Sequence, residues 1–173
     1  QRIAEMIESL DTAVAMVRRI AIDLRPPMLD DLGLHAAIEW LAHDSSRRLG
    51  LHMTVSADEI DPPLDERTSI AVFRLFQDAL SHIARTAGAT RLHVELRSHE
   101  HELVLRLDDN GIGAVESLNA DAPTHGAVDG AIALRQQALH LGGALTIETL
   151  PVKGHRVTLQ VPTKRISDTT RLA

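Results

Sequence analysis

Two glycine-bearing segments are the part of this sequence whose residue types and spacing could hold a nucleotide. The first is DNGIG at residues 109–113, and the second is the start of a predicted helix at Gly130. Glycine lets a backbone approach a ligand closely, and the first turn of a helix offers free amide donors to phosphate. Either segment alone is more often an ordinary turn, so the neighbouring residues decide what the pair indicates.

A polar face on one predicted helix supplies the neighbouring residues. Over residues 65–87 apolar residues recur at spacings of three and four, so one stripe of the helix faces a core. The other face carries Gln77, Asp78, Ser81, His82 and Arg85. An ordinary solvated face, with Asp78 and Arg85 as a solvated pair, is the simpler alternative. Because the flanking strands would place this face between the glycine segments, the three groups together predict a nucleotide site.

The rest of the pattern predicts the elements that would position this site. Helical spacing of apolar residues predicts helices over residues 35–49, 65–87 and 130–141. Alternating residues predict strands over residues 51–55, 91–97, 102–108, 144–150 and 155–161. Residues 114–129 are small and polar, so a mobile loop is expected there. This order predicts an α/β fold, a two-layer sandwich of one mixed sheet and three helices.

The N-terminal residues follow a different pattern. From Ile3 to Leu24 apolar residues alternate strictly at three and four, which is typical of a narrow seam between helices. A core helix of the same domain is the alternative, but a strict seam favours self-association in a bundle. The expected organisation is a bundle helix over residues 1–25, a hinge around the prolines over 26–34, a compact domain over 35–163 and a flexible tail over 164–173.

Composition excludes several classes of function. A net charge of −6 would not neutralise a phosphate backbone, so no nucleic-acid partner is expected. The chain has no cysteine, which excludes disulfides and thiolate metal sites and fits a reducing compartment. It has neither an apolar run of about 18 residues nor a signal-peptide pattern, so any membrane contact would come from segments outside it. The histidines show no ligand spacing, and no metal site is assigned.

Four stretches together resemble the sensor histidine kinases of the nitrate-sensor and hexose-phosphate-sensor type, over nearly the whole chain. They are LRPPMLDDLGLHAAIEWL from residue 24, FRLFQDALSHIARTAGATRLHVEL from 73, DDNGIG from 108 and GAIALRQQALHLGGALTIET from 130. These look like the family's junction after its second dimerisation helix, its N box and its two glycine boxes. The resemblance implies a GHKL (Bergerat) ATP-binding domain, of the superfamily that includes gyrase and MutL.

The resemblance also implies a role for each matching residue. Asp109 would accept a hydrogen bond from the adenine amino group, which needs an acceptor, while Gly111 and Gly113 shape the turn. Asp78 would be the catalytic residue, at a position where the family usually has Glu. The remaining cofactor contacts would come from His82, Arg85 and Gly130. ATP is therefore the expected cofactor.

The phosphate side of the expected site departs from the family pattern. His82 stands where the family has the Asn that holds Mg²⁺, and imidazole offers nitrogen where Mg²⁺ prefers oxygen. Ala133 stands where Gly is usual, and its methyl group would hinder close backbone approach. Further departures are Thr86, Gln136 and Gln137. These changes predict weakened Mg²⁺ and phosphate handling and a retained fold.

The implied function is the catalytic core of a two-component sensor kinase. A cytoplasmic homodimer joined through the N-terminal helix would transfer the γ-phosphoryl of ATP to a histidine upstream of this chain, and thence to a response regulator receiver domain. His43 beside Asp44 mimics the family's acceptor pair, but it follows the double proline and is expected to be a surface histidine. Two alternatives are a degenerate kinase-like module that dimerises and binds a partner with weak or no catalysis, and a gyrase-like ATPase outside signalling. The junction at residues 24–41 speaks against the gyrase-like ATPase.

Overall fold

The computed structural model describes residues 27–60, 64–99, 101–112 and 127–163. The helices are α2 (Pro27–Leu49), α3 (Glu66–Thr86) and α4 (Ala127–His140). The strands are β1 (His52–Ala57), β2 (Arg91–Ser98), β3 (Glu102–Asp109), β4 (Ala144–Thr149) and β5 (His155–Pro162). The predicted bundle helix, most of the predicted loop and the predicted tail lie outside the described residues. All the other predicted helices and strands are present.

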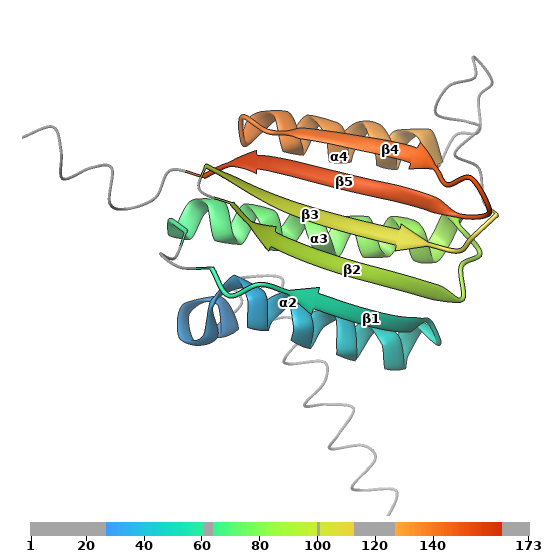
Figure 1. Cartoon of the computed structure of the whole chain (residues 1–173), viewed down its shortest axis with the longest axis horizontal. Coiled ribbons are helices and arrows are strands. Elements are labelled where there is room, and N and C mark those ends of the chain that lie inside the picture. Colours follow the sequence, from blue (N-terminus) through green and yellow to red (C-terminus); the bar gives the residue numbers. More distant parts are fainter. Residues whose placement is uncertain (1–26, 61–63, 100, 113–126, 164–173) are drawn as a thin grey trace, which may run out of the picture.

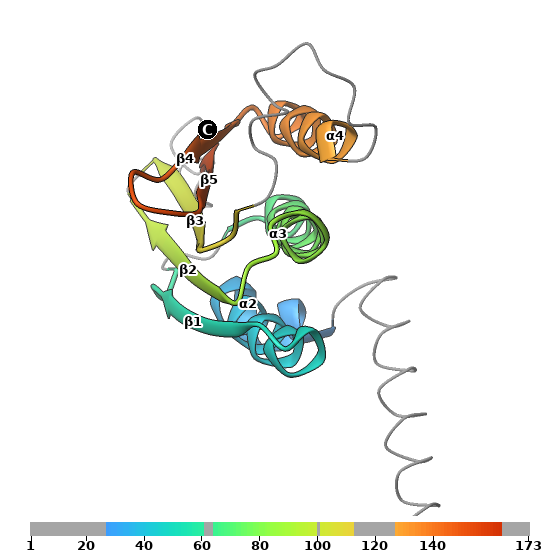
Figure 2. The ribbon, with the colours of Figure 1, turned by 90° about the vertical axis from the view of Figure 1, so that its right-hand side faces the viewer.

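The five strands form one mixed sheet in the order β1-β2-β3-β5-β4. Strand β1 runs parallel to β2, and all other neighbours are antiparallel. The three helices cover one face of this sheet and leave the other face open (Figures 1 and 2). The predicted two-layer sandwich of one mixed sheet and three helices is therefore confirmed. None of the described helices combines the length and apolar character needed to cross a membrane.

The core lies between the sheet and the helices and is mostly aliphatic. Strand β3 buries every second residue, Leu103, Leu105 and Leu107, toward the helical layer. Helix α3 contributes Phe73 and Phe76, the two phenylalanines of the chain, and both are almost fully buried. Because burying one such side chain is worth about 1.5–3 kcal/mol, these contacts hold α3 firmly against the sheet.

Helix α2 begins earlier than the sequence predicts. Its first residue is Pro27, at a position where proline is favoured because the first amides of a helix have no acceptor in it. Gly33 interrupts the helix with φ 78° and ψ 175°, which produces a kink. The predicted hinge at residues 26–34 therefore includes a helical segment that precedes a kink at Gly33.

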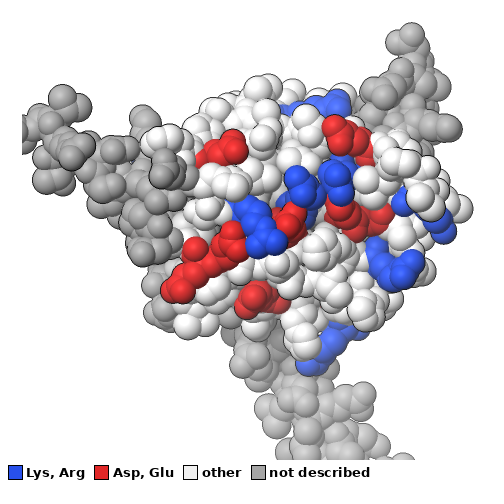
Figure 3. Space-filling view, viewed as in Figure 1, with Lys and Arg blue, Asp and Glu red and all other residues white. Residues whose placement is uncertain are grey.

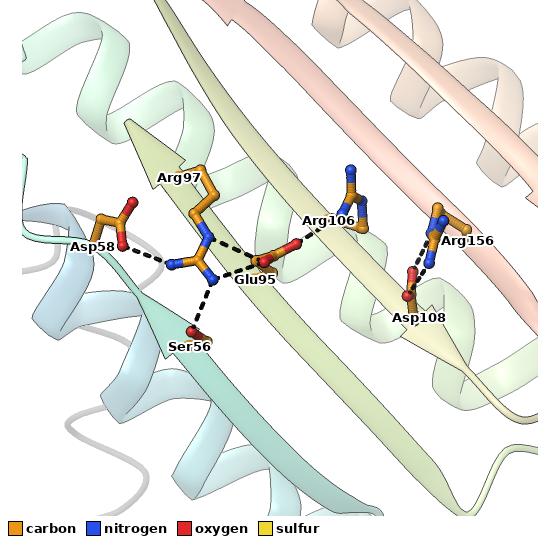
Figure 4. A network of polar contacts seen from close by, with 7 residues as sticks. All are labelled: Ser56, Asp58, Glu95, Arg97, Arg106, Asp108 and Arg156. Carbon is orange, nitrogen blue, oxygen red and sulfur yellow. Dashed lines mark hydrogen bonds and ion pairs between the residues drawn. The ribbon is translucent and has the colours of Figure 1, made fainter. Parts of the chain in front are cut away.

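The open face of the sheet carries a network of charged side chains (Figures 3 and 4). The Arg97 guanidinium binds Asp58 at 2.7 Å and Glu95 at 2.8 Å, and Arg106 reaches the second oxygen of Glu95 at 2.8 Å. These hydrogen bonds to Asp58 and Glu95 raise the pKa of Arg97. A separate bidentate pair joins Arg156 to Asp108. Because both signs of charge alternate, this network does not form a uniformly basic surface.

Asp65 caps the N-terminus of α3, the helix that carries the predicted polar face. Its carboxylate accepts a hydrogen bond from the Thr68 amide at 3.0 Å and another from the Thr68 hydroxyl at 2.6 Å. The hydroxyl hydrogen bond is the main reason why the pKa of Asp65 lies below its ordinary value. The cap therefore stabilises the start of α3 most when this carboxylate is charged.

Replacing Asp65 by Ala is expected to lower the free energy of unfolding by about 1 kcal/mol, the usual effect of losing an N-cap. Because the folded-state pKa is lowered, the difference is fully present above the ordinary value of 3.8 and is lost as the pH falls through the folded-state pKa. Urea unfolding at pH 7 and near pH 2 measures it. Asp65→Asn keeps the side-chain acceptor and should retain most of the stability at pH 7. Equal stability of wild type and Asp65→Ala at pH 7 would contradict the role of the cap.

Candidate nucleotide-binding site

Asp109 ends strand β3, and its side chain is only 2% exposed. Its Oδ1 atom accepts a 2.6 Å hydrogen bond from the Gly111 amide, as expected for a short polar side chain at a tight turn. The Nδ1 atom of His155 lies 3.5 Å from the same oxygen. Within the described part of the chain, no residue donates a hydrogen bond to Oδ2. Among the described residues, Oδ1 is therefore the carboxylate oxygen that meets polar groups of the protein.

Two glycines make room for this turn. A Cβ atom on Gly111 would overlap the carbonyl oxygen of Ala87, the residue that caps the C-terminus of α3. The same carbonyl accepts a 2.9 Å hydrogen bond from the Ile112 amide, so the turn lies directly against the end of α3. Gly154 has φ 103°, and a Cβ atom there would overlap the carbonyl oxygen of Asp109. Close backbone contact on both sides thus fixes the position of Asp109.

Asn110 connects the same turn to strand β2, and no role was predicted for it from the sequence. Its Oδ1 atom accepts hydrogen bonds from the amides of Thr90, at 2.9 Å, and Arg91, at 2.8 Å. Its position in a glycine turn could have indicated this role, because the short amide side chain of Asn often forms hydrogen bonds with nearby backbone groups. Asn110 therefore helps to hold the turn between α3 and β2.

A second group of predicted residues lies where α3 and α4 meet. Gln137 of α4 donates a 2.9 Å hydrogen bond to the Asp78 carboxylate of α3. A Cβ atom on Gly130 would lie only 2.5 Å from Nδ1 of His82, so this imidazole packs against the first turns of α4. These two contacts show that α3 and α4 run antiparallel, side by side (Figure 2). Arg85 is exposed and lies one helical turn beyond His82 on α3.

The surroundings of His82 favour its neutral form. Its pKa is lowered, first by burial and second by the positive charge of Arg85. A neutral imidazole presents a nitrogen lone pair, whereas Mg²⁺ prefers oxygen ligands. In the described residues, no group of three or more His, Cys, Asp or Glu side chains could hold a metal ion. A neutral imidazole at position 82 is therefore a poor ligand for Mg²⁺.

The structure therefore gathers the predicted residues into two groups. Asp109 and Gly111 form one group at the end of β3, and Asp78, His82 and Gly130 form the other between α3 and α4. Helix α3 contacts both groups, while Gly113 lies outside the described residues. The roles of these residues in binding stay predictions. The surface histidine His43 is exposed on α2, and its neighbour Asp44 pairs with Arg48 at 2.8 Å.

Comparison with known proteins finds sensor histidine kinases among the similar sequences. No protein-family model matches it. The sensor histidine kinase MctS of Rhizobium johnstonii is 36% identical over 107 residues, which cover 62% of this chain and 23% of MctS. The sensor histidine kinase ComP of Bacillus subtilis is 26% identical over 92% of this chain and 20% of ComP. For the sensor histidine kinase NarS of Mycobacterium tuberculosis the identity is 27%, over 95% of this chain and 38% of NarS. The chain thus spans about a fifth to two fifths of the length of these relatives.

Solved structures agree with the sequence relatives. The ATP-binding domain of PrrB from Mycobacterium tuberculosis superposes with a TM-score of 0.56 at 21% identity, over 75% of this chain and 93% of that one. The Erythrobacter litoralis EL346 blue-light activated histidine kinase gives a TM-score of 0.64 at 22% identity, over 91% of this chain and 57% of that one. The fold is that of a histidine kinase ATP-binding domain.

The sequence relatives of this histidine-kinase-like domain are sensor histidine kinases. The predicted resemblance is confirmed to that extent, and the predicted fold matches that of solved histidine kinase ATP-binding domains. Membership of the nitrate-sensor and hexose-phosphate-sensor subfamily stays a prediction.

Proposed function

We propose that this chain is the ATP-binding catalytic core of a two-component sensor histidine kinase, and that Asp109 accepts a hydrogen bond from the adenine amino group. The observation that carries the proposal is the buried carboxylate of Asp109 in this fold. A buried carboxylate is costly unless donors surround it. Gly111 supplies a donor to Oδ1, and an exocyclic amine would supply one to Oδ2. A carboxylate can only accept, so it favours adenine over a base with a carbonyl group there.

The phosphates would lie at the other group of residues, near the start of α4. Ala87 comes five residues after His82, a rise of about 7.5 Å along α3, so the base and the phosphates would occupy different points along this helix. The first amides of α4 and the cationic Arg85 both favour an anion. Gly130 would allow close approach, and Asp78 would be the catalytic carboxylate.

The same chain would work inside a longer protein. We expect the γ-phosphoryl of ATP to pass to a histidine upstream of residue 1 and then to an aspartate of a response regulator receiver domain. A homodimer formed through residues 1–25 would bring the histidine and the ATP site together. The support is that the sequence relatives are sensor histidine kinases.

A kinase-like module with weak or no catalysis is the second candidate. Two observations favour it. Gln137 donates a hydrogen bond to the Asp78 carboxylate, and His82 offers a nitrogen where Mg²⁺ prefers oxygen. Such a module would keep adenine binding and lose metal-dependent handling of the phosphates. The two candidates therefore differ in how nucleotide binding depends on Mg²⁺.

Thermal unfolding with ADP or ATP, with and without Mg²⁺, separates these candidates. A ligand that binds only the folded state stabilises it by RT ln(1 + [L]/Kd), so a ligand at 100 times its Kd adds about 2.7 kcal/mol. A rise in Tm that requires Mg²⁺ supports the kinase. A rise that is indifferent to Mg²⁺ supports binding without transfer, and no rise at millimolar nucleotide contradicts both.

Replacing His82 by Asn is expected to strengthen Mg²⁺-dependent ATP binding by about tenfold, which corresponds to roughly 1.4 kcal/mol. The amide oxygen of Asn is a ligand that Mg²⁺ accepts, whereas imidazole nitrogen is not favoured. Titration calorimetry with ATP, with and without Mg²⁺, measures the change. His43→Asn is the matched control, because His43 is exposed on α2. If His82→Asn leaves the metal dependence as it is in the wild type, residue 82 does not face the metal.

A further inference from the structure

His155 is a buried histidine to which the proposed function gives no role. It begins strand β5, its side chain is 9% exposed, and its Nδ1 lies 3.5 Å from Oδ1 of Asp109. The preceding residue, Gly154, packs against the carbonyl of Asp109, so the backbone that carries the imidazole is held in place. The pairing of Arg156 with Asp108 across β3 and β5 fixes the same register. The turn at Gly154 and the pairing of β3 with β5 therefore both hold the imidazole beside the carboxylate.

We propose that His155 is a positioning residue that orients the Asp109 carboxylate toward a purine with an exocyclic amino group. This inference rests on the proposed function, in which Asp109 binds the base. The Gly111 amide and the His155 imidazole both approach Oδ1. With Oδ1 turned toward these two protein groups, Oδ2 is the oxygen left for the ligand.

The physical basis is the orientation of a two-oxygen acceptor. Rotation of a carboxylate about its Cβ–Cγ bond exchanges its oxygens, and a polar group beside one oxygen selects one orientation. At 3.5 Å the His155 contact is longer than an ordinary N–H···O hydrogen bond, so it acts as an electrostatic contact. Such contacts are stronger in a buried, weakly polar environment than in water. Without the imidazole, the Gly111 hydrogen bond would be the contact with a described residue that still holds this carboxylate oxygen.

The consequence concerns selectivity more than overall affinity. A site built to bind a donor rejects an analogue that lacks it, because a buried polar group then stays unpaired. ADP has an amino group on its purine, whereas inosine diphosphate has a carbonyl oxygen at the same position. A well-oriented carboxylate should therefore separate these two ligands strongly, and a loosely held one should separate them weakly.

The test is titration calorimetry with ADP and inosine diphosphate on the full 173-residue chain. The wild type should prefer ADP. His155→Phe keeps an aromatic ring without a polar nitrogen, and it should lower ADP affinity by about tenfold, with inosine diphosphate affinity changed less than about twofold. His155→Asn places an amide nitrogen near the position of Nδ1 and should keep most of the preference.

Specific results would overturn the inference. They are an unchanged ADP preference in His155→Phe, an equal loss of both ligands in that variant, or a preference in His155→Asn as low as in Asp109→Ala. If His155→Phe does not fold, the His155→Asn result decides alone. Failure of the proposed function looks different, because the wild type would then show no preference for ADP, or Asp109→Ala would retain it.

Discussion

Replacing Asp109 by Ala is expected to weaken ADP binding roughly 10- to 100-fold. A hydrogen bond to a charged group is worth about 1.5–3 kcal/mol, and the variant removes the only acceptor that we propose for the adenine amino group. Removing the side chain also leaves the Gly111 amide without its 2.6 Å partner. Titration calorimetry without Mg²⁺ measures this loss of ADP affinity without any contribution from metal binding.

The neighbouring residue provides the matched control. Asp108 lies on the same strand, but its carboxylate is on the open face of the sheet, where Arg156 binds it at 2.6 and 2.7 Å (Figure 4). Asp108→Ala removes the same charge one residue away, so any general effect of charge or strand stability appears in both variants. We expect it to bind ADP within about twofold of the wild type. Equal losses in the two variants would mean that Asp109 does not contact the base.

Replacing Gly154 by Ala is expected to lower the free energy of unfolding by about 3 kcal/mol. One part is backbone strain, since a φ of 103° is poorly accessible to residues with a Cβ atom and costs about 1–3 kcal/mol. The other part is steric, since the Cβ atom would overlap the carbonyl oxygen of Asp109, and backbone cannot move away as a side chain can. Urea unfolding measures the loss.

Gly50→Ala is the control for this second variant. Gly50 also has a positive φ, of 62°, but nothing lies within 4 Å of a Cβ atom placed there. It should therefore show only the cost of a left-handed backbone, about 1–2 kcal/mol. If Gly154→Ala and Gly50→Ala lose the same free energy of unfolding, the turn between β4 and β5 does not pack closely against Asp109.

Local patterns in the sequence were sufficient to predict the layers of the fold. The alternation in residues 102–108 places Leu103, Leu105 and Leu107 on one face, because successive strand residues point to opposite sides. The spacing around Phe73 and Phe76 gives α3 its buried stripe for the same kind of reason. The early start of α2 was not predicted, because the two prolines were interpreted as a hinge, whereas the helix begins at Pro27.

Contacts between distant residues were not predictable in the same way. His155 lies 46 residues after Asp109 in the sequence, and only the pairing of β5 with β3 brings them together. The hydrogen bond from Gln137 to Asp78 likewise depends on the antiparallel packing of α3 and α4. The turn that contains Asp109 and Gly111 was predictable from the sequence, because Asp, Asn and Gly in succession are typical of a turn. The sequence did not indicate which residues surround them.

The most direct test of the central claim is a crystal structure of the chain with ADP. We predict that the exocyclic nitrogen of adenine lies within about 3.2 Å of a carboxylate oxygen of Asp109, the limit for such a hydrogen bond. An adenine ring bound away from Asp109, or no bound ADP at millimolar concentration, would contradict this account.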